Sequence, residues 1–96
     1  MIGGVTTSRT RVTLADDDVL LREGLAGLLE RKGFDVVGQC GDPTELIALV
    51  GEHRPELAIV DIRMPPSHTT EGLDAARVIR DEVPSTAIVV LSGTSR

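Results

Sequence analysis

Aromatic residues are almost absent from this sequence: Phe34 is the only one among 96 residues, and aromatics make up 1% of the composition. A folded core must therefore consist of aliphatic side chains, which supply most of the 41% hydrophobic content. Cys40 is the only cysteine, so an internal disulfide is excluded. No segment reaches the roughly 20 consecutive apolar residues of a membrane-spanning helix, and we expect no membrane association.

Positive charge is also scarce, because 10 Lys and Arg residues face 15 Asp and Glu residues, for a net charge of -5 at pH 7. An acidic domain is a poor candidate for direct binding to nucleic acid or anionic membranes, since both reward neutralisation by Lys and Arg. Residues 1–10 are small and polar and lack the hydrophobic centre of a signal peptide. They predict a flexible tail, and the lone cysteine agrees with a reducing, cytoplasmic location.

Short apolar runs alternate with segments of helical periodicity along the rest of the chain. The predicted strands are Arg11–Ala15, Phe34–Gln39, Leu57–Asp61 and Ala87–Leu91. The last three are nearly continuous apolar runs, which is typical of strands covered on both faces of a parallel sheet. Strands that alternate with helices, joined by right-handed crossovers, predict a single doubly wound α/β domain.

Helices are predicted between these strands. The first runs from a cap at Asp18 to about Lys32, and Gly33 suits the left-handed residue that follows a helix. The second begins at Asp42-Pro43-Thr44-Glu45, which combines an acidic N-cap with proline at the first helical position. The third covers about 72–82. Leucines at helical spacing give the first helix one apolar stripe: Leu21, Leu25, Leu28 and Leu29.

Acidic side chains occur where two of the predicted strands end. Asp16 and Asp17 follow the first strand, and Asp61 ends the third. Ligands of open parallel sheets bind beyond the carboxyl ends of the strands, so these carboxylates converge if the two strands are neighbours. Their mutual repulsion favours a divalent cation, and Mg²⁺ suits carboxylate and phosphate oxygens. A carboxylate beside Mg²⁺ can also act as the nucleophile in phosphoryl transfer.

Ser92 follows the fourth strand at the same edge, where its hydroxyl can bond a phosphoryl oxygen carried by Asp61. Each residue also has a simpler interpretation, because Asp at a strand end often forms a turn or caps a helix, and Ser-Gly is an ordinary turn. The combination of an acid pair, a single acid and a hydroxyl after three different strands favours a phosphoryl-accepting site.

These motifs resemble the receiver domain of two-component response regulators, and residues 18–25 resemble the NarL/LuxR type. The resemblance extends from Arg11 to Gly93 and implies a flavodoxin-like receiver fold with strand order 2-1-3-4. The matching segments are Leu14–Asp18, Val60–Pro65, Gly72-Leu73 and Val89–Gly93.

The resemblance also implies roles for single residues. Asp61 would receive a phosphoryl group from a sensor histidine kinase. Asp17 and Asp61 would bind Mg²⁺ directly, Asp16 would act partly through water, and the backbone carbonyl of Arg63 would add an oxygen ligand. Ser92 would be the switch hydroxyl that moves toward the phosphoryl group, and an attached output domain would respond.

The sequence departs from the family pattern in two respects. The loop before Gly72 is longer than usual and contains His68, which we expect to be an exposed loop residue. The family's fifth strand, last helices and catalytic lysine are absent, since the only lysine is Lys32 in the first predicted helix. We therefore expect residues 11–96 to be a partial receiver of a longer regulator.

Two further expectations follow from this partial receiver. Its transcriptional, helix-turn-helix output would lie outside these residues, so DNA would be bound only through that domain. The unpaired apolar edge of Ala87–Leu91 would favour a homodimer or a segment-exchanged oligomer.

Three other functions compete with this interpretation. A phosphatase that uses an aspartyl phosphate would place a second acid two residues after Asp61, where this chain has Arg63. A nucleotide- or flavin-binding module would have a glycine-rich loop after the first strand, where this chain has acids. A receiver-like module that only dimerises, without phosphorylation, remains open, because intact site residues indicate capacity and not use.

Overall fold

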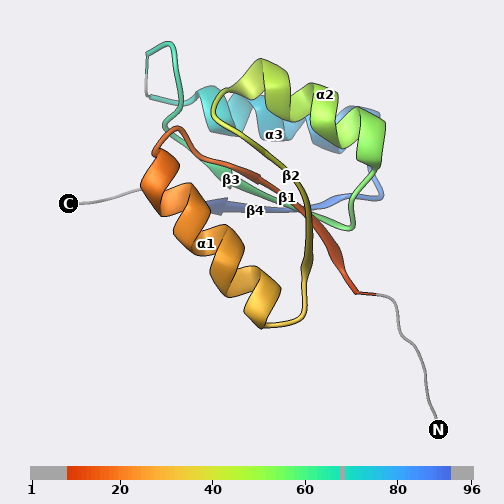
Figure 1. The fold of residues 1–96 in the computed structure, drawn as a ribbon. Helices are drawn as coiled ribbons and strands as arrows, with labels where there is room; N and C mark the ends of the chain where they lie inside the picture. Colours follow the sequence, from red (N-terminus) through yellow and green to blue (C-terminus); the bar gives the residue numbers. More distant parts are fainter. Residues whose placement is uncertain (1–8, 68, 92–96) are drawn as a thin grey trace, which may run out of the picture.

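The computed structural model describes residues 9–67 and 69–91, which form a parallel sheet with helices between its strands (Figure 1). The strand order is β2-β1-β3-β4, and every neighbouring pair is parallel. The predicted doubly wound α/β fold and its strand order are therefore confirmed. The elements are β1 (Arg11–Ala15), α1 (Val19–Arg31), β2 (Asp35–Cys40), α2 (Pro43–His53), β3 (Leu57–Asp61), α3 (Glu71–Glu82) and β4 (Ala87–Leu91).

Local signals set the helix ends. The carboxylate of Asp18 accepts a hydrogen bond from the backbone N–H of Leu21 at 3.1 Å, and Asp42 caps α2 in the same way through Glu45 at 2.8 Å. Such caps satisfy N–H groups that have no partner inside the helix. Gly33 follows α1 with a φ of 95°, in the region that glycine enters without steric cost. The predicted caps and the left-handed glycine are thus confirmed.

The boundaries of β2 differ from the prediction by one residue at each end. Phe34 is not part of the strand, because its N–H donates to the carbonyl of Leu29 and completes the end of α1. Cys40 belongs to the strand, because it pairs with Ala15 of β1. The strand therefore ends one residue closer to the edge that carries the acidic side chains.

The core lies mainly on one face of the sheet, between the strands and the helices α2 and α3 (Figure 1). Aliphatic side chains fill it, as the near absence of aromatics required. Fully buried members include Leu46 and Val50 of α2, Val60 of β3 and Ile79 of α3.

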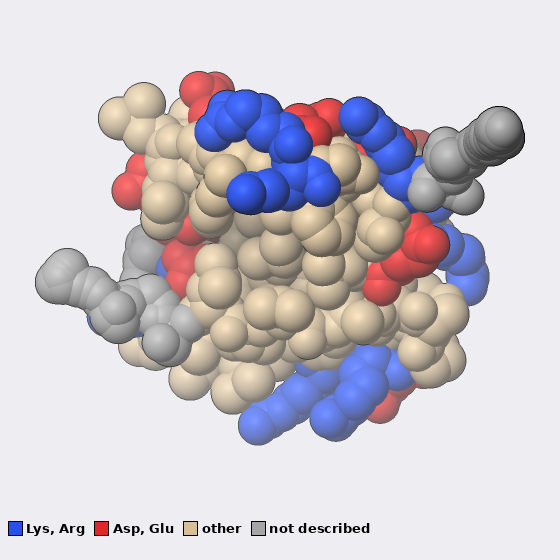
Figure 2. All heavy atoms as spheres, turned by 90° about the horizontal axis from the view of Figure 1, so that it is seen from below, with Lys and Arg blue, Asp and Glu red and all other residues tan. Residues whose placement is uncertain are grey.

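Among residues 9–67 and 69–91, the opposite face is covered only by α1, which packs on β2 and β1 (Figure 1). The predicted leucine stripe is therefore only partly buried: Leu21 and Leu28 remain 51% and 43% exposed. Val89 of β4 is 45% exposed, so within the described part of the chain β4 is not covered on both faces, contrary to the prediction from its apolar run. Seen from below, this side of the molecule has a broad uncharged centre with charged side chains around it (Figure 2).

None of the helices described is both long enough and apolar enough to cross a membrane.

Candidate functional site

The carboxyl ends of β1 and β3 lie side by side, because Ala15 pairs with Val60 in the parallel register. The residues that follow these partners are Asp16 and Asp61, and Asp17 is next along the chain. The structure brings the three side chains together, with one carboxylate oxygen from each within 4.8 Å of the others. The convergence expected from the sequence is therefore present at this edge.

Asp16 is the buried member of the cluster, with 2% of its surface exposed. Its N–H donates to the carbonyl of Cys40 at 3.0 Å, and its carboxylate accepts from the N–H of Asp18 at 2.9 Å. Burial raises the pKa of Asp16; the hydrogen bond from Asp18 opposes this, and the negative charges of Asp61 and Asp17 add to the rise. The fold therefore brings negative charges together at this edge, and their burial and mutual repulsion are unfavourable.

Asp61 is half-buried at the end of β3, and its carboxylate accepts a hydrogen bond from the N–H of Arg63 at 3.1 Å. The backbone of Arg63, the second residue of the loop that follows β3, therefore lies directly beside the cluster. Ser92 lies outside the described residues, so its predicted position at this edge remains a prediction.

These carboxylates fit a small, hard divalent cation. Oxygen ligands are what Mg²⁺ takes in proteins, usually from one or two carboxylates, with water and phosphate completing its coordination. Burial is the largest cause of the raised pKa of Asp16, and a positive ion at this position would relieve the repulsion from Asp61 and Asp17 that adds to it.

The loop after β3 is anchored by residues to which the sequence interpretation gave no structural role. Met64 is fully buried in the core, and the N–H of Gly72 donates to the carbonyl of Ile62 at 2.8 Å. At the tip of the loop, the carboxylate of Glu71 accepts hydrogen bonds from the N–H and hydroxyl of Ser67 and from the N–H of Thr69. The hydroxyl of Ser67 is the main reason that the pKa of Glu71 falls to about 2.

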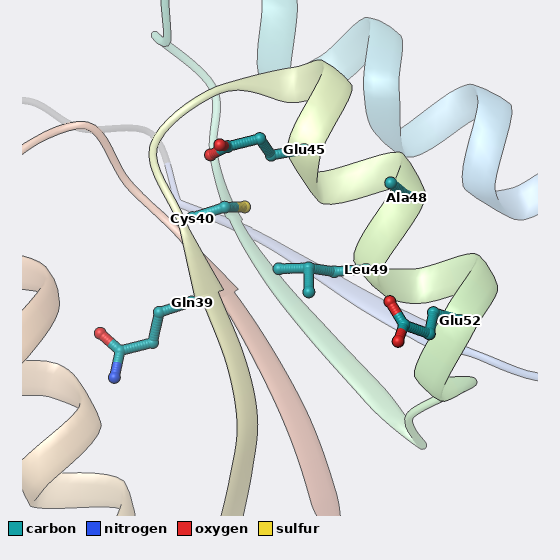
Figure 3. Close-up of a pocket in the computed structure, with 6 residues that line it drawn as sticks. All are labelled: Gln39, Cys40, Glu45, Ala48, Leu49 and Glu52. Carbon is teal, nitrogen blue, oxygen red and sulfur yellow. The ribbon is translucent and has the colours of Figure 1, made fainter.

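A shallow cavity of about 250 Å³ lies between β2 and α2, and Cys40 is one of the residues that line it (Figure 3). Leu49 and Ala48 form its apolar part, and Glu45 and Glu52 stand at its margin (Figure 3). Burial, the largest cause, raises the pKa of the Cys40 thiol to about 11. The thiol is therefore protonated at neutral pH, and the cavity contains none of the three clustered carboxylates.

Comparison with known proteins agrees with this geometry. Residues 12–96 match the family model described as the response regulator receiver domain. Among curated proteins, the chain is 35% identical over 86 residues to the transcriptional regulatory protein PdtaR of Mycobacterium tuberculosis, which covers 90% of this chain and 40% of that protein. The chain thus spans less than half the length of this relative. Other curated relatives are named as protein-glutamate methylesterases.

Solved structures show the same likeness. The signal receiver domain of the putative response regulator NarL from M. tuberculosis is 28% identical, with a TM-score of 0.82, over 94% of this chain and 71% of that chain. A LuxR-family two-component response regulator from Aurantimonas sp. SI85-9A1 is 32% identical, with a TM-score of 0.77, over 86% and 58% of the two chains.

The family match covers the described helices and strands apart from Arg11, the first residue of β1, and it includes each of the clustered carboxylates. Members of this family are signalling modules rather than classical enzymes. This chain belongs to the response regulator receiver domains, and a LuxR-family regulator and a NarL receiver domain are among the solved structures it is similar to.

Proposed function

We propose that Asp61 accepts a phosphoryl group from a phosphohistidine of a sensor histidine kinase in a Mg²⁺-dependent reaction. The observation that carries this proposal is the convergence of Asp16, Asp17 and Asp61 at the carboxyl edge of the sheet, within 4.8 Å. The half-buried position of Asp61 leaves its carboxylate accessible to a donor.

In the proposed reaction, a carboxylate oxygen of Asp61 attacks phosphorus, the phosphorus–nitrogen bond breaks and the imidazole of the donor leaves with the electron pair. The N–H of Arg63 orients the carboxylate by donating to Oδ1. Asp17, Asp61 and the backbone carbonyl of Arg63 would hold Mg²⁺, with Asp16 acting partly through water. When bound, the ion supplies positive charge for the phosphoryl oxygens.

Ser92 is proposed as the hydroxyl that moves toward the phosphoryl group after transfer. The lysine that would pair with this group has no candidate among the described residues, because Lys32 caps the C-terminal end of α1. That end leads into β2 and so lies at the opposite edge of the sheet from Asp61.

The output controlled by Asp61 is proposed to be transcriptional, through a helix-turn-helix domain that binds DNA, in a cytoplasmic regulator. The support is that relatives with this kind of receiver are named as transcriptional regulators. A response regulator of this kind would at most catalyse its own phosphorylation and dephosphorylation.

The second candidate function is a receiver-like dimerisation module that is not phosphorylated. The exposed apolar side chains on α1 and β4, such as Leu20 and Val89, favour it. Both functions use the same fold, so the chemistry of Asp61 separates them.

The experiment is incubation with acetyl phosphate, with and without Mg²⁺, followed by intact-mass measurement. We expect one added phosphoryl group only with Mg²⁺, and none in Asp61→Asn. The matched control is Asp81→Asn, which makes the same charge change at an exposed position of α3. Absence of label in the folded wild-type chain with Mg²⁺ would refute the proposal and favour the dimerisation module.

A further inference from the structure

The side chain of Arg22 in α1 contacts the backbone of Asp16, a member of the acidic cluster. Its Nη1 donates to the carbonyl oxygen of Asp16 at 2.8 Å. Asp16 is also held at two other atoms: its N–H donates to the carbonyl of Cys40, and its carboxylate accepts a hydrogen bond from the N–H of Asp18. Among the hydrogen bonds described here, the one from Arg22 is the only side-chain bond to the carbonyl oxygen of Asp16.

The guanidinium of Arg22 is partly enclosed by the fold. Its Nε is buried and has no hydrogen-bond partner. Burying such a donor without a partner is unfavourable, and a surface arginine that serves only solubility avoids it. The burial of Nε indicates that the role of Arg22 is to place its guanidinium against the carbonyl of Asp16.

Gly41 supplies the space for this contact. A Cβ at Gly41 would lie 3.0 Å from Nη1 of Arg22, 3.6 Å from Cα of Asp17 and 3.8 Å from the carbonyl oxygen of Asp16. Three segments therefore meet here: the end of β1, the end of β2 and the first turn of α1. A side chain at position 41 would push the tip of Arg22 away from its acceptor.

The carbonyl of Asp16 and the N and Cα of Asp17 belong to one planar peptide unit. A group that fixes this carbonyl therefore also fixes the N–Cα bond of Asp17, so that only rotation about this bond is left to set where the side chain leaves the backbone. Asp17 is one of the carboxylates proposed to bind Mg²⁺, and outer-shell contacts of this kind orient metal ligands.

We propose that Arg22, in the space left by Gly41, is a positioning residue that sets the orientation of Asp17 for divalent-cation binding. This inference rests on the proposed function. Arg22 acts through the Asp16 peptide and not as a ligand or a catalytic group.

The sign of the effect separates positioning from simple charge. Arg22 is a cation near a site for a cation, so its removal would tighten Mg²⁺ binding if charge alone mattered. If positioning dominates, Arg22→Met weakens Mg²⁺ binding, by roughly tenfold, the lower end of the range for outer-shell residues. Gly41→Ala keeps the charge and should weaken binding in the same direction by a smaller factor.

The measurement is the dissociation constant for Mg²⁺ from backbone amide shifts in two-dimensional NMR, on chains whose unfolding midpoints are determined in parallel. Arg31→Met is the control for charge loss on the same exposed helix, and Gly51→Ala is the control for glycine, since nothing lies within 4 Å of a Cβ there. Both controls should bind Mg²⁺ like the wild type. A lower midpoint alone does not change the affinity of molecules that remain folded.

Hydrogen exchange of the metal-free chain provides a second measurement. In Arg22→Met and Gly41→Ala, the Asp16 amide should lose protection relative to the amide of Leu14, while both controls keep it. Arg22→Lys keeps the positive charge but lacks the planar guanidinium, and it replaces Arg22→Met in these measurements if that variant does not fold.

The outcomes distinguish the two proposals. Unchanged or tighter Mg²⁺ binding in folded Arg22→Met and Gly41→Ala overturns the inference and leaves the proposed function standing. If the wild type binds no Mg²⁺, the proposed function fails, and unchanged exchange at Asp16 in the variants would then overturn the inference independently.

Discussion

A side chain at position 72 would collide with the backbone of Asp61: a Cβ on Gly72 would lie 1.8 Å from the carbonyl oxygen of Asp61 and 2.7 Å from its carbonyl carbon. No rotation of a side chain relieves such an overlap, because both atoms belong to the strand itself. The start of α3 therefore packs directly on the residue proposed to accept the phosphoryl group.

This contact predicts that Gly72→Ala is strongly destabilising. The backbone of α3 or of β3 must move, and we expect a loss of about 3 kcal/mol in the free energy of unfolding, the upper part of the range for overpacking. Urea denaturation measures it. Gly51→Ala, in a helix with open space around it, should instead be neutral or slightly stabilising. Equal stabilities of the two variants would show that the close approach is not present.

Mg²⁺ is predicted to stabilise the wild-type chain through the carboxylate cluster. A ligand that binds only the folded state at ten times its dissociation constant adds about 1.4 kcal/mol. Asp61→Asn should raise the metal-free stability, because it removes a charge that acts on buried Asp16, and should abolish most of the Mg²⁺ effect. Thermal unfolding with and without Mg²⁺ tests both effects, and a Mg²⁺ shift of wild-type size in Asp61→Asn would contradict them.

Glu71 is predicted to make the loop after β3 sensitive to acid. Its pKa is lowered from 4.5 to about 2, first by the hydroxyl of Ser67. The folded state therefore disfavours the protonated form, and the stabilisation of the loop is complete above pH 4.5 and lost as the pH falls toward 2. Protection factors of the Ser67 and Thr69 amides should fall in this window. In Ser67→Ala, the titration of Glu71 should move up toward 4.5; an unchanged titration would exclude the assigned cause.

Cys40 is predicted to react slowly with iodoacetamide at neutral pH. It is 4% exposed, and burial, the largest cause, raises its pKa from 9.0 to about 11. Since the thiolate is the nucleophile, the reaction should be far slower than in the chain unfolded by urea. The folded state disfavours the thiolate, so this group lowers the stability as the pH rises from 9 toward 11. Folded-state reaction as fast as that of the unfolded chain would contradict the burial.

Self-association of this chain is predicted from β4, which lies at the edge of the described sheet. Exposed edges with apolar side chains pair readily with another chain, and an edge lysine prevents this. The weight-average mass from light scattering should rise with concentration in the wild type and stay monomeric in Val89→Lys. Thr44→Lys, an exposed change on α2, should behave like the wild type. A monomer at all concentrations in every variant would refute the prediction.

Much of the fold could be predicted because its signals are local. Asp18 and Asp42 cap their helices through N–H groups three residues away, and these bonds depend on few neighbours. The apolar runs located the strands for the same reason, and the acids after two parallel strands had to appear at one edge.

Other features depended on residues far apart in the sequence. The contact between Gly72 and the carbonyl of Asp61 and the meeting of Arg22, Gly41 and Asp16 involve separate elements whose distance is set only by packing. Arg22 lay within a recognised motif, and its spacing from Asp18 placed it near the start of α1. No local pattern distinguishes it from a surface arginine.

The sequence by itself determined the order of strands and helices, their caps and the identity of the clustered carboxylates, because these follow from bonds and periodicities within a few residues. Only the tertiary structure decided how the cluster is held. It buried Asp16, seated α3 against Asp61 and left one side of β4 and α1 exposed, since each of these depends on how the helices pack on the sheet.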